Sequence, residues 1–254
     1  MLNTTQTATP LTITQTTARF VALDIETGNA PNDAIERAIE NYKPPSNVKD
    51  AAKIEAKRVE NALKRHDKAA LLDASPILCI ACRTDTGGFL FDGMNAPPFD
   101  VANWELIASE NEKTMLQAFR TWADSTITPE TVITGHNAIG FDLPKIRNAY
   151  IRHRLQLPLF LSLALRNENS CEIVDTMKIA KSFSMQHRDN LFISLDTLAD
   201  ILNIERPKQA MSGAQVPAAY ERGEYAPILI YCCIDTETTA QAFQLMTGIS
   251  PVLH

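Results

Sequence analysis

The chain has 254 residues, 45% of them hydrophobic, and a formal net charge of −6 at pH 7. This length and composition allow a full hydrophobic core, and no apolar run is long enough to span a membrane. The acidic balance excludes a binder held to nucleic acid by general electrostatic attraction, whose domain is usually basic, but not an enzyme that meets phosphates through metal ions and a local basic patch.

The amino-terminal residues and the cysteines indicate the compartment. The start of the chain lacks the basic and apolar segments of a signal peptide, so we expect a cytoplasmic protein without a membrane partner. Five cysteines, an odd number, favour reduced thiols over a disulfide framework. Cys79 and Cys82 form a Cys-x-x-Cys, but an offset of three within a strand turns them to opposite faces, so we expect buried thiols rather than a zinc or redox pair.

The first part of the chain divides into an arm and a strand. Residues 1–17 are rich in Thr and Gln without a hydrophobic period, and we expect them to be disordered or loosely attached. We expect residues 18–254 to form a single domain. Its first strand, at about 18–26, is apolar and is followed by a turn.

Two carboxylates lie at the end of this strand. A period of two places Asp24 and Glu26 on one face and the apolar side chains on the other. Two anions side by side on a buried strand lose hydration and repel each other, so they favour a cation between them, and magnesium and manganese prefer such oxygen ligands. The motif alone is a weak signal, because solvated charge has the same pattern and a second copy occurs at Asp235 and Glu237.

The composition changes between about residues 30 and 75, where we expect a basic helical insertion. Helical patterns cover 33–42 and 48–72, and two prolines separate them. Residues 43–68 contain eight Lys or Arg against four Asp or Glu. Two interpretations stay open: a solvated helix with charge pairs at (i, i+4), or a helical arm that contacts phosphates.

Strands and amphipathic helices alternate in the rest of the chain. The patterns predict strands at 76–84, 88–92, 131–135 and 172–175, and helices at 111–125, 145–155, 194–201, 211–222 and 224–246. The first two of these strands are joined as a hairpin. The alternation predicts an α/β fold with a mixed β-sheet, antiparallel in its first strands and then parallel, flanked by helices.

Two further carboxylates stand at informative positions. Asp142 lies where a helix begins, with Pro144 in its first turn, so it is an N-cap, a side chain facing the carboxyl edge of the sheet where α/β proteins bind ligands, or both. Tyr231 and Asp235 are four residues apart and share one face of the last helix. That helix is largely apolar, and a lone buried aspartate is rare without a partner.

Three motifs therefore follow one another along the chain: Asp24-x-Glu26, Asn137-x-x-x-Phe141-Asp142 and Tyr231-x-x-x-Asp235. In this order they resemble the DEDD superfamily of 3′–5′ exonucleases, in its tyrosine subgroup. Residues 135–144, 212–216 and 231–238 look like the predicted exonucleases related to the proofreading domain of family B DNA polymerases. The resemblance covers roughly residues 18–28 and 76–246 and implies a ribonuclease-H-like fold.

The resemblance implies a mechanism and its residues. Asp24, Glu26, Asp142 and Asp235 would hold two divalent cations, Mg²⁺ or Mn²⁺, about 4 Å apart astride the scissile phosphate. Tyr231 would orient the attacking water by a hydrogen bond. The resemblance also implies that the backbone of Thr27 and Gly28 contacts the terminal nucleotide. Asn137 would support the turn before Asp142.

The expected substrate is a single-stranded or frayed 3′ end of DNA, because a base-paired terminus keeps the phosphate out of a narrow cleft. Two alternatives stay open. The same residues would serve a 3′–5′ exoribonuclease that trims RNA, and the fold could also carry a non-catalytic nucleic-acid or protein-binding module. We expect no attached polymerase module, so the enzyme would be freestanding or work with a separate polymerase or another protein partner.

Overall fold

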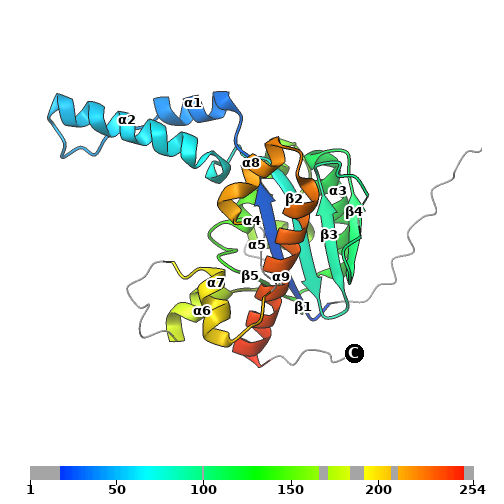
Figure 1. Ribbon diagram of the computed structural model, residues 1–254. Helices are drawn as coiled ribbons and strands as arrows, with labels where there is room; N and C mark the ends of the chain where they lie inside the picture. The colour runs from blue at the N-terminus through cyan, green and yellow to red at the C-terminus, as the bar shows by residue number, and fades with distance from the viewer. Residues whose placement is uncertain (1–17, 99, 166–170, 184–191, 207–210, 249–254) are drawn as a thin grey trace, which may run out of the picture.

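The computed structural model describes residues 18–98, 100–165, 171–183, 192–206 and 211–248, so the arm expected at 1–17 lies outside the described residues. A mixed sheet with the order β4-β3-β2-β1-β5-β6 forms the centre of the molecule (Figure 1). Its strands are β1 (Phe20–Thr27), β2 (Ile77–Thr84), β3 (Gly88–Asp92), β4 (Trp104–Ala108), β5 (Val132–Gly135) and β6 (Glu172–Asp175).

The strand directions confirm the predicted α/β fold with a mixed sheet. β2 pairs antiparallel with both β1 and β3, whereas the pairs β3 with β4, β1 with β5 and β5 with β6 are parallel. The carboxyl ends of β1, β5 and β6 therefore meet at one edge of the sheet. The sequence did not predict β4, an edge strand of five residues in which none is fully buried.

The helices of the described residues are α1 (Asn32–Glu40), α2 (Ala51–Asp67), α3 (Glu112–Thr126), α4 (Asp142–Arg152), α5 (Leu159–Leu165), α6 (Thr176–Phe183), α7 (Leu195–Leu202), α8 (Val216–Glu221) and α9 (Tyr225–Thr247). Two short 3₁₀ turns, η1 (Ala69–Leu71) and η2 (Gly213–Gln215), precede β2 and α8. The sequence predicted neither α5 nor α6. A search of the described helices for one long and apolar enough to cross a membrane found none.

Both faces of β1 are covered, which makes it the central strand of the core. Val21, Leu23 and Ile25 pack against the side chains of α3, α4 and α5. Phe20 and Ala22 face α9, where the ring centroid of Phe20 lies 5.5 Å from that of Phe243. The strand period of two therefore directs the next polar residues of β1 toward α9.

The two cysteines of the Cys-x-x-Cys occupy opposite sides of β2. Cys79 packs in the cluster beneath α8 and α9, and Cys82 packs in the cluster with α3. Both are buried free thiols, as the offset of three predicted.

Residues 31–68 form a helical arm that projects from the carboxyl end of β1 (Figure 1). α1 buries Ile35, and α2 buries no residue. The arm is thus attached to the sheet mainly through its base, residues 69–75.

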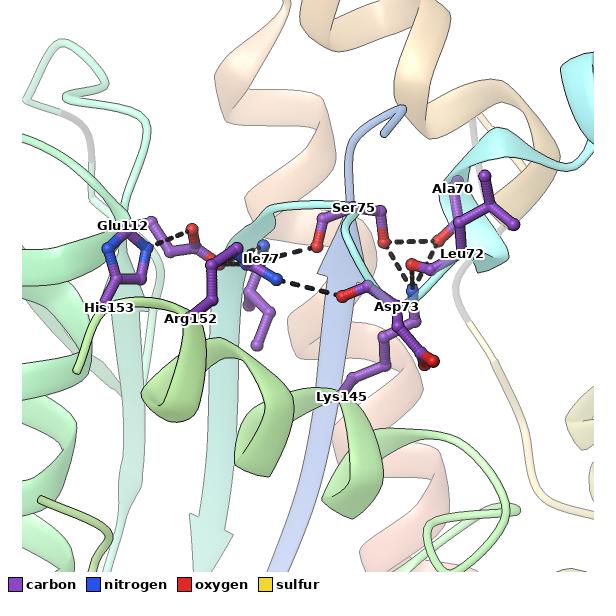
Figure 2. A network of polar contacts seen from close by, with 9 residues as sticks. All are labelled: Ala70, Leu72, Asp73, Ser75, Ile77, Glu112, Lys145, Arg152 and His153. Carbon is purple, nitrogen blue, oxygen red and sulfur yellow. Dashed lines mark hydrogen bonds and ion pairs between the residues drawn. The ribbon is translucent and has the colours of Figure 1, made fainter. Parts of the chain in front are cut away.

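Hydrogen bonds from β1 and from α4, together with one inside the base, hold these residues; Figure 2 shows those of Ser75 and Lys145. The carbonyl oxygen of Ala70 accepts from Thr27 Oγ1 at 3.1 Å, Ser75 Oγ at 2.8 Å and Lys145 Nζ at 3.1 Å. Lys145 also donates to the carbonyl oxygen of Leu72. The helix α4, which carries Lys145, therefore fixes the point where the arm returns to the sheet.

A second part of the same network ties α4 to α3 and to the start of β2. Arg152 donates to the carbonyl oxygen of Asp73 at 3.0 Å and pairs with Glu112 at 2.6 Å (Figure 2). Glu112 also accepts from the backbone N–H of Ile77 at 2.8 Å and contacts His153 Nε2 at 2.7 Å. These bonds make α4 a brace between the arm and the core.

We expect Lys145→Met to lower the free energy of unfolding by about 1–3 kcal/mol, because it removes a buried donor from carbonyl oxygens at the base of the arm. Burial lowers the pKa of Lys145 to about 8, so the ammonium is still charged at pH 7. Urea unfolding at pH 7 measures the change. Lys113→Met, on the exposed surface of α3, is the matched control. A loss no larger than that of the control would show that the Lys145 contacts do not stabilise the fold.

Candidate active site

Asp24 and Glu26 form the centre of the candidate site, on the α9 face of β1. Together with Cys232 of α9 they form a cluster whose potential ligand atoms all lie within 4.8 Å of one another. The Cys232 sulfur lies 3.6 Å from both Oδ2 and the main-chain oxygen of Asp24. The sequence did not identify Cys232, although its place three residues before Asp235 on one helix was a usable signal.

Asp142 reaches the same strand from the side of β5. β5 pairs with β1 only over Phe20, Ala22 and the residue between them, so β1 continues beyond it with an open edge. The Asp142 carboxylate is buried and receives a backbone hydrogen bond from Ile25, in the part of β1 that lies past β5. The structure places Phe141 at the N-cap of α4, without a side-chain capping bond, so Asp142 is not the ordinary N-cap that the sequence allowed.

The turn between β5 and α4 sets the position of Asp142. Asn137 has a φ of 66°, in the left-handed region, and its carbonyl oxygen accepts from the N–H groups of Gly140 at 3.0 Å and Phe141 at 2.9 Å. A Cβ atom added at Gly140 would lie 2.5 Å from Asn137 Oδ1, so a larger residue there would require the Asn137 side chain to move.

Asp175, at the end of β6, holds this turn, and the sequence did not identify it as part of the site. Its buried carboxylate accepts from the backbone N–H groups of Asn137 at 3.1 Å, Ile139 at 3.2 Å and Met177 at 3.0 Å. The signal that could have found it is an aspartate at the carboxyl end of a strand that runs directly into a helix. Asp175 is thus a positioning residue for the start of α4.

Tyr231 and Asp235 lie on consecutive turns of α9, as their spacing predicted, and both are half-buried. A side-chain hydrogen bond links them. The tyrosine hydroxyl also lies beside η2, since a Cβ atom added at Gly213 would be 3.6 Å from it. The second Asp-x-Glu motif, Asp235 and Glu237, does not act as a carboxylate pair. Glu237 forms an ion pair with Arg83 at 3.1 Å and does not join the cluster around Asp24.

Thr27 and Gly28 connect the site to the base of the arm. Thr27 is buried, and its hydroxyl donates to the carbonyl oxygen of Ala70. The N–H of Gly28 donates to the carbonyl oxygen of Pro76 at 3.0 Å, and an added Cβ atom would lie 3.2 Å from Pro76 Cγ. The end of β1 is therefore closely packed behind the carboxylates.

Burial and the charges of neighbouring carboxylates raise the pKa values of the acidic groups in the site. Burial is the main cause that raises the pKa of Asp24 well above its usual range, and the charges of Asp142 and Asp235 add to it. Burial and then the charge of Asp24 do the same for Glu26. The pKa of Asp142 is raised to about 7, by burial above all, although backbone hydrogen bonds oppose the shift.

A hard divalent cation fits this donor set. Among the ion pairs of the described residues, no lysine, arginine or histidine neutralises Asp24, Glu26 or Asp142. Burial raises the pKa of Cys232, so its sulfur stays a neutral thiol beside Asp24. The available ligands are then carboxylate oxygens, which suit magnesium and manganese better than softer metals.

Comparison with known proteins supports a nuclease. A family model described as "predicted 3′–5′ exonuclease related to the exonuclease domain of PolB" matches residues 94–249. The matched segment includes Asn137, Asp142, Tyr231 and Asp235, and it begins after Asp24, Glu26 and the arm. A comparison with curated proteins found no match.

We expect the metal-free protein to lose stability as pH rises from about 5 to 8. The folded-state pKa values of Asp24, Glu26 and Asp142 lie above the ordinary values, so their contribution is fully present below about pH 4 and is lost as pH rises through the folded values, about 7 for Asp142. Each group changes the free energy of unfolding by up to about 1.4 kcal/mol per pH unit. Urea unfolding with a chelator measures this.

Asp142→Asn should flatten that pH dependence, because it removes one of the titrating groups, whereas the exposed Asp200→Asn should leave it unchanged. Mg²⁺ or Mn²⁺ should stabilise the wild-type protein more at pH 8 than at pH 5, since cations bind the ionised carboxylates. A metal-free protein whose stability rises over this range would contradict the raised pKa values.

Proposed function

Because the chain belongs to the family of predicted 3′–5′ exonucleases related to the exonuclease domain of PolB, we propose that it removes nucleotides from the 3′ end of DNA. The substrate is single-stranded or frayed, and the reaction is a metal-dependent phosphodiester hydrolysis. The clustering of Asp24, Glu26 and Asp142 at the carboxyl end of β1, where none of the described basic side chains pairs with them, carries the proposal.

Asp24, Glu26, Asp142 and Asp235 are the proposed ligands of two divalent cations, Mg²⁺ or Mn²⁺. The raised pKa values of Asp24, Glu26 and Asp142 support this, because a site that favours bound protons favours bound cations for the same electrostatic reason. When bound, the cations would make a water molecule more acidic and neutralise charge on the scissile phosphate. The Cys232 thiol donates toward Asp24 and orients that carboxylate from the side of α9.

Tyr231 is the proposed hydrogen-bonding group for the attacking water. Burial raises its pKa above the ordinary value, and the charges of Asp235 and Glu26 raise it further. The hydroxyl therefore stays protonated at neutral pH and cannot act as a base. It can orient a water molecule beside Asp235, which fits the tyrosine mechanism.

The terminal nucleotide is proposed to meet the backbone at Thr27 and Gly28, where β1 ends beside Glu26. Asn137 supports the turn before Asp142, and Asp175 supports Asn137. The described contacts of this site do not distinguish DNA from RNA, so the substrate test compares both.

We expect a 5′-labelled single strand of DNA to be shortened stepwise from its 3′ end when Mg²⁺ or Mn²⁺ is present. A 3′-phosphorylated strand should resist digestion, because its terminus no longer fits against the end of β1. Gel analysis of matched DNA and RNA strands measures the products and the preference.

Asp142→Asn should nearly abolish the reaction while the protein stays folded, and it is the control against a contaminating nuclease. Preferred digestion of the RNA strand would make the enzyme an exoribonuclease. Rapid cutting of a circular single strand would contradict an exonuclease.

We expect Tyr231→Phe to lower kcat on the order of ten- to a thousandfold, the range typical of a positioned group in proton handling. KM should barely change, because the hydroxyl acts in the transition state rather than in substrate binding. Steady-state kinetics on labelled DNA separate the two constants.

Tyr225→Phe is the matched control, since its ring lies on the same helix and packs against Tyr220 with centroids 5.7 Å apart. That change should leave kcat within about twofold. A Tyr231→Phe enzyme as active as the control would remove the hydroxyl from the mechanism.

A further inference from the structure

A row of four lysines follows one side of α2, and neither the sheet nor the carboxylate site requires it. Lys53, Lys57, Lys64 and Lys68 are separated by intervals of four, seven and four residues, which place them on one side of the helix. Lys57 is half-buried and the other three are exposed. At 1.5 Å per residue the row is about 22 Å long.

The lysine row lacks the acidic partners expected of an ordinary solvated helix. The ion pair that the structure shows within α2 joins Arg58 to Glu55 at 3.8 Å, and neither residue belongs to the row. Glu60 lies within a turn of Lys57 and Lys64, yet no described carboxylate is within ion-pair distance of any lysine of the row. The four charges are therefore available to another molecule.

Helix stability does not explain the row either. Basic residues at the carboxyl end of a helix favour its dipole, which accounts for Lys64 in the last turn of α2 and Lys68 at its C-cap. Lys53 stands in the first turn, where a positive charge is unfavourable, beside the N-cap Asp50. Since α2 also buries no residue, its lysines do not shield a core.

The row begins next to the candidate active site. Lys68 adjoins η1, and the Ala70 carbonyl oxygen in η1 accepts a hydrogen bond from Thr27, the neighbour of Glu26. Lys145 binds the same carbonyl from α4, the helix that Asp142 begins. From this base the row leads away from the body along the projecting arm (Figure 1).

The charge of the arm is opposite to that of the rest of the chain. Residues 31–68 carry nine basic against seven acidic residues, a net charge of +2 in a chain of −6, so the remaining residues carry −8; the basic excess lies in residues 43–68, with eight basic against four acidic residues. A polyanion is thus repelled by the body as a whole and attracted to the arm.

We propose that the lysine row binds the phosphate backbone of the single-stranded DNA that lies on the 5′ side of the scissile bond. The arm holds the strand while its 3′ end lies at the carboxylates, and a row of this length spans about six nucleotides at the spacing of stacked bases. This inference rests on the proposed exonuclease function and adds the contact that keeps a long substrate on the enzyme.

The test measures binding of a 5′-fluorescein single-stranded DNA of about 24 nucleotides by anisotropy, with a chelator present, over a series of salt concentrations. Replacing all four lysines of the row with Gln should weaken binding about tenfold or more at low salt and lower the slope of log affinity against log salt by about 3. Hydrolysis of a trinucleotide, which is too short to lie along the whole row, should change much less than hydrolysis of the long strand.

A smaller change, the double variant Lys53→Gln with Lys57→Gln, tests half of the row. Two other double variants are its matched controls. Arg19→Gln with Arg83→Gln removes the same charge at the opposite end of β1, where the two arginines pair with acidic residues. Val59→Ser with Leu63→Ser changes the exposed apolar side of α2, where these residues are 53% and 62% exposed. Only the lysine pair should weaken binding of the long strand by more than about threefold.

Equal losses in the lysine pair and either control would overturn the inference, because net charge or helix damage would then explain them. A row variant that binds and digests long DNA like wild type would also overturn it and leave the exonuclease function standing. Binding that depends on the row in a protein that hydrolyses no DNA would support the lysine contact and refute the proposed function.

Discussion

The burial of several carboxylates around one strand is the constraint on which the rest of the structure depends. Charged groups of one sign lose hydration and repel one another in such a place, so the ionised state is costly without a counter-ion. The fold keeps them there because β1 cannot move: it is paired on both sides and packed on both faces. β5 is short, and its early end leaves the edge of β1 open to Asp142. The alternation of β1 thus places Asp24 and Glu26 on one face, and the end of the β1–β5 pairing leaves backbone groups of β1 free to bond with Asp142.

The residue that positions the turn before α4 is also an aspartate, Asp175, and backbone N–H groups surround its carboxylate. Asp175 adds a further negative charge that raises the pKa of Asp142. It is stable where it lies because its oxygens accept several backbone N–H bonds, including those of the turn that starts α4. Asp175 therefore holds the scaffold through its hydrogen bonds, while the raised pKa values of Asp24, Glu26 and Asp142 suit those groups to exchange protons for cations.

Local patterns predicted most elements, and contacts between distant segments account for what was missed. The capping box at Asn111 and the cap at Ser194 mark α3 and α7 directly in the sequence. β4 gives a poor signal because an edge strand needs no continuous apolar run. Sequence spacing predicted which residues of one motif lie side by side, such as Tyr231 and Asp235 on one face of α9. Spacing offered only a local signal for Cys232 and Asp175 and did not show their partners, because one acts on a strand about 200 residues earlier and the other on a turn in a different segment. Tertiary packing likewise decided that Asp142 reaches β1 instead of capping its own helix.

A site built from anions has to capture a polyanion, and the arm resolves this conflict by separating the two tasks in space. The acidic body repels the strand at a distance, and bound cations reduce that repulsion only within the site itself. Lysines that stand on a projecting helix attract the phosphates without neutralising the carboxylates, because the row leads away from them. The brace of Lys145 and Arg152 fixes the base of the arm to α4, so the attracted strand is presented beside the residues that position Asp142. On the proposed function, capture would weaken with added salt, whereas hydrolysis would depend on divalent cations, so one substrate would be governed by two different ionic requirements.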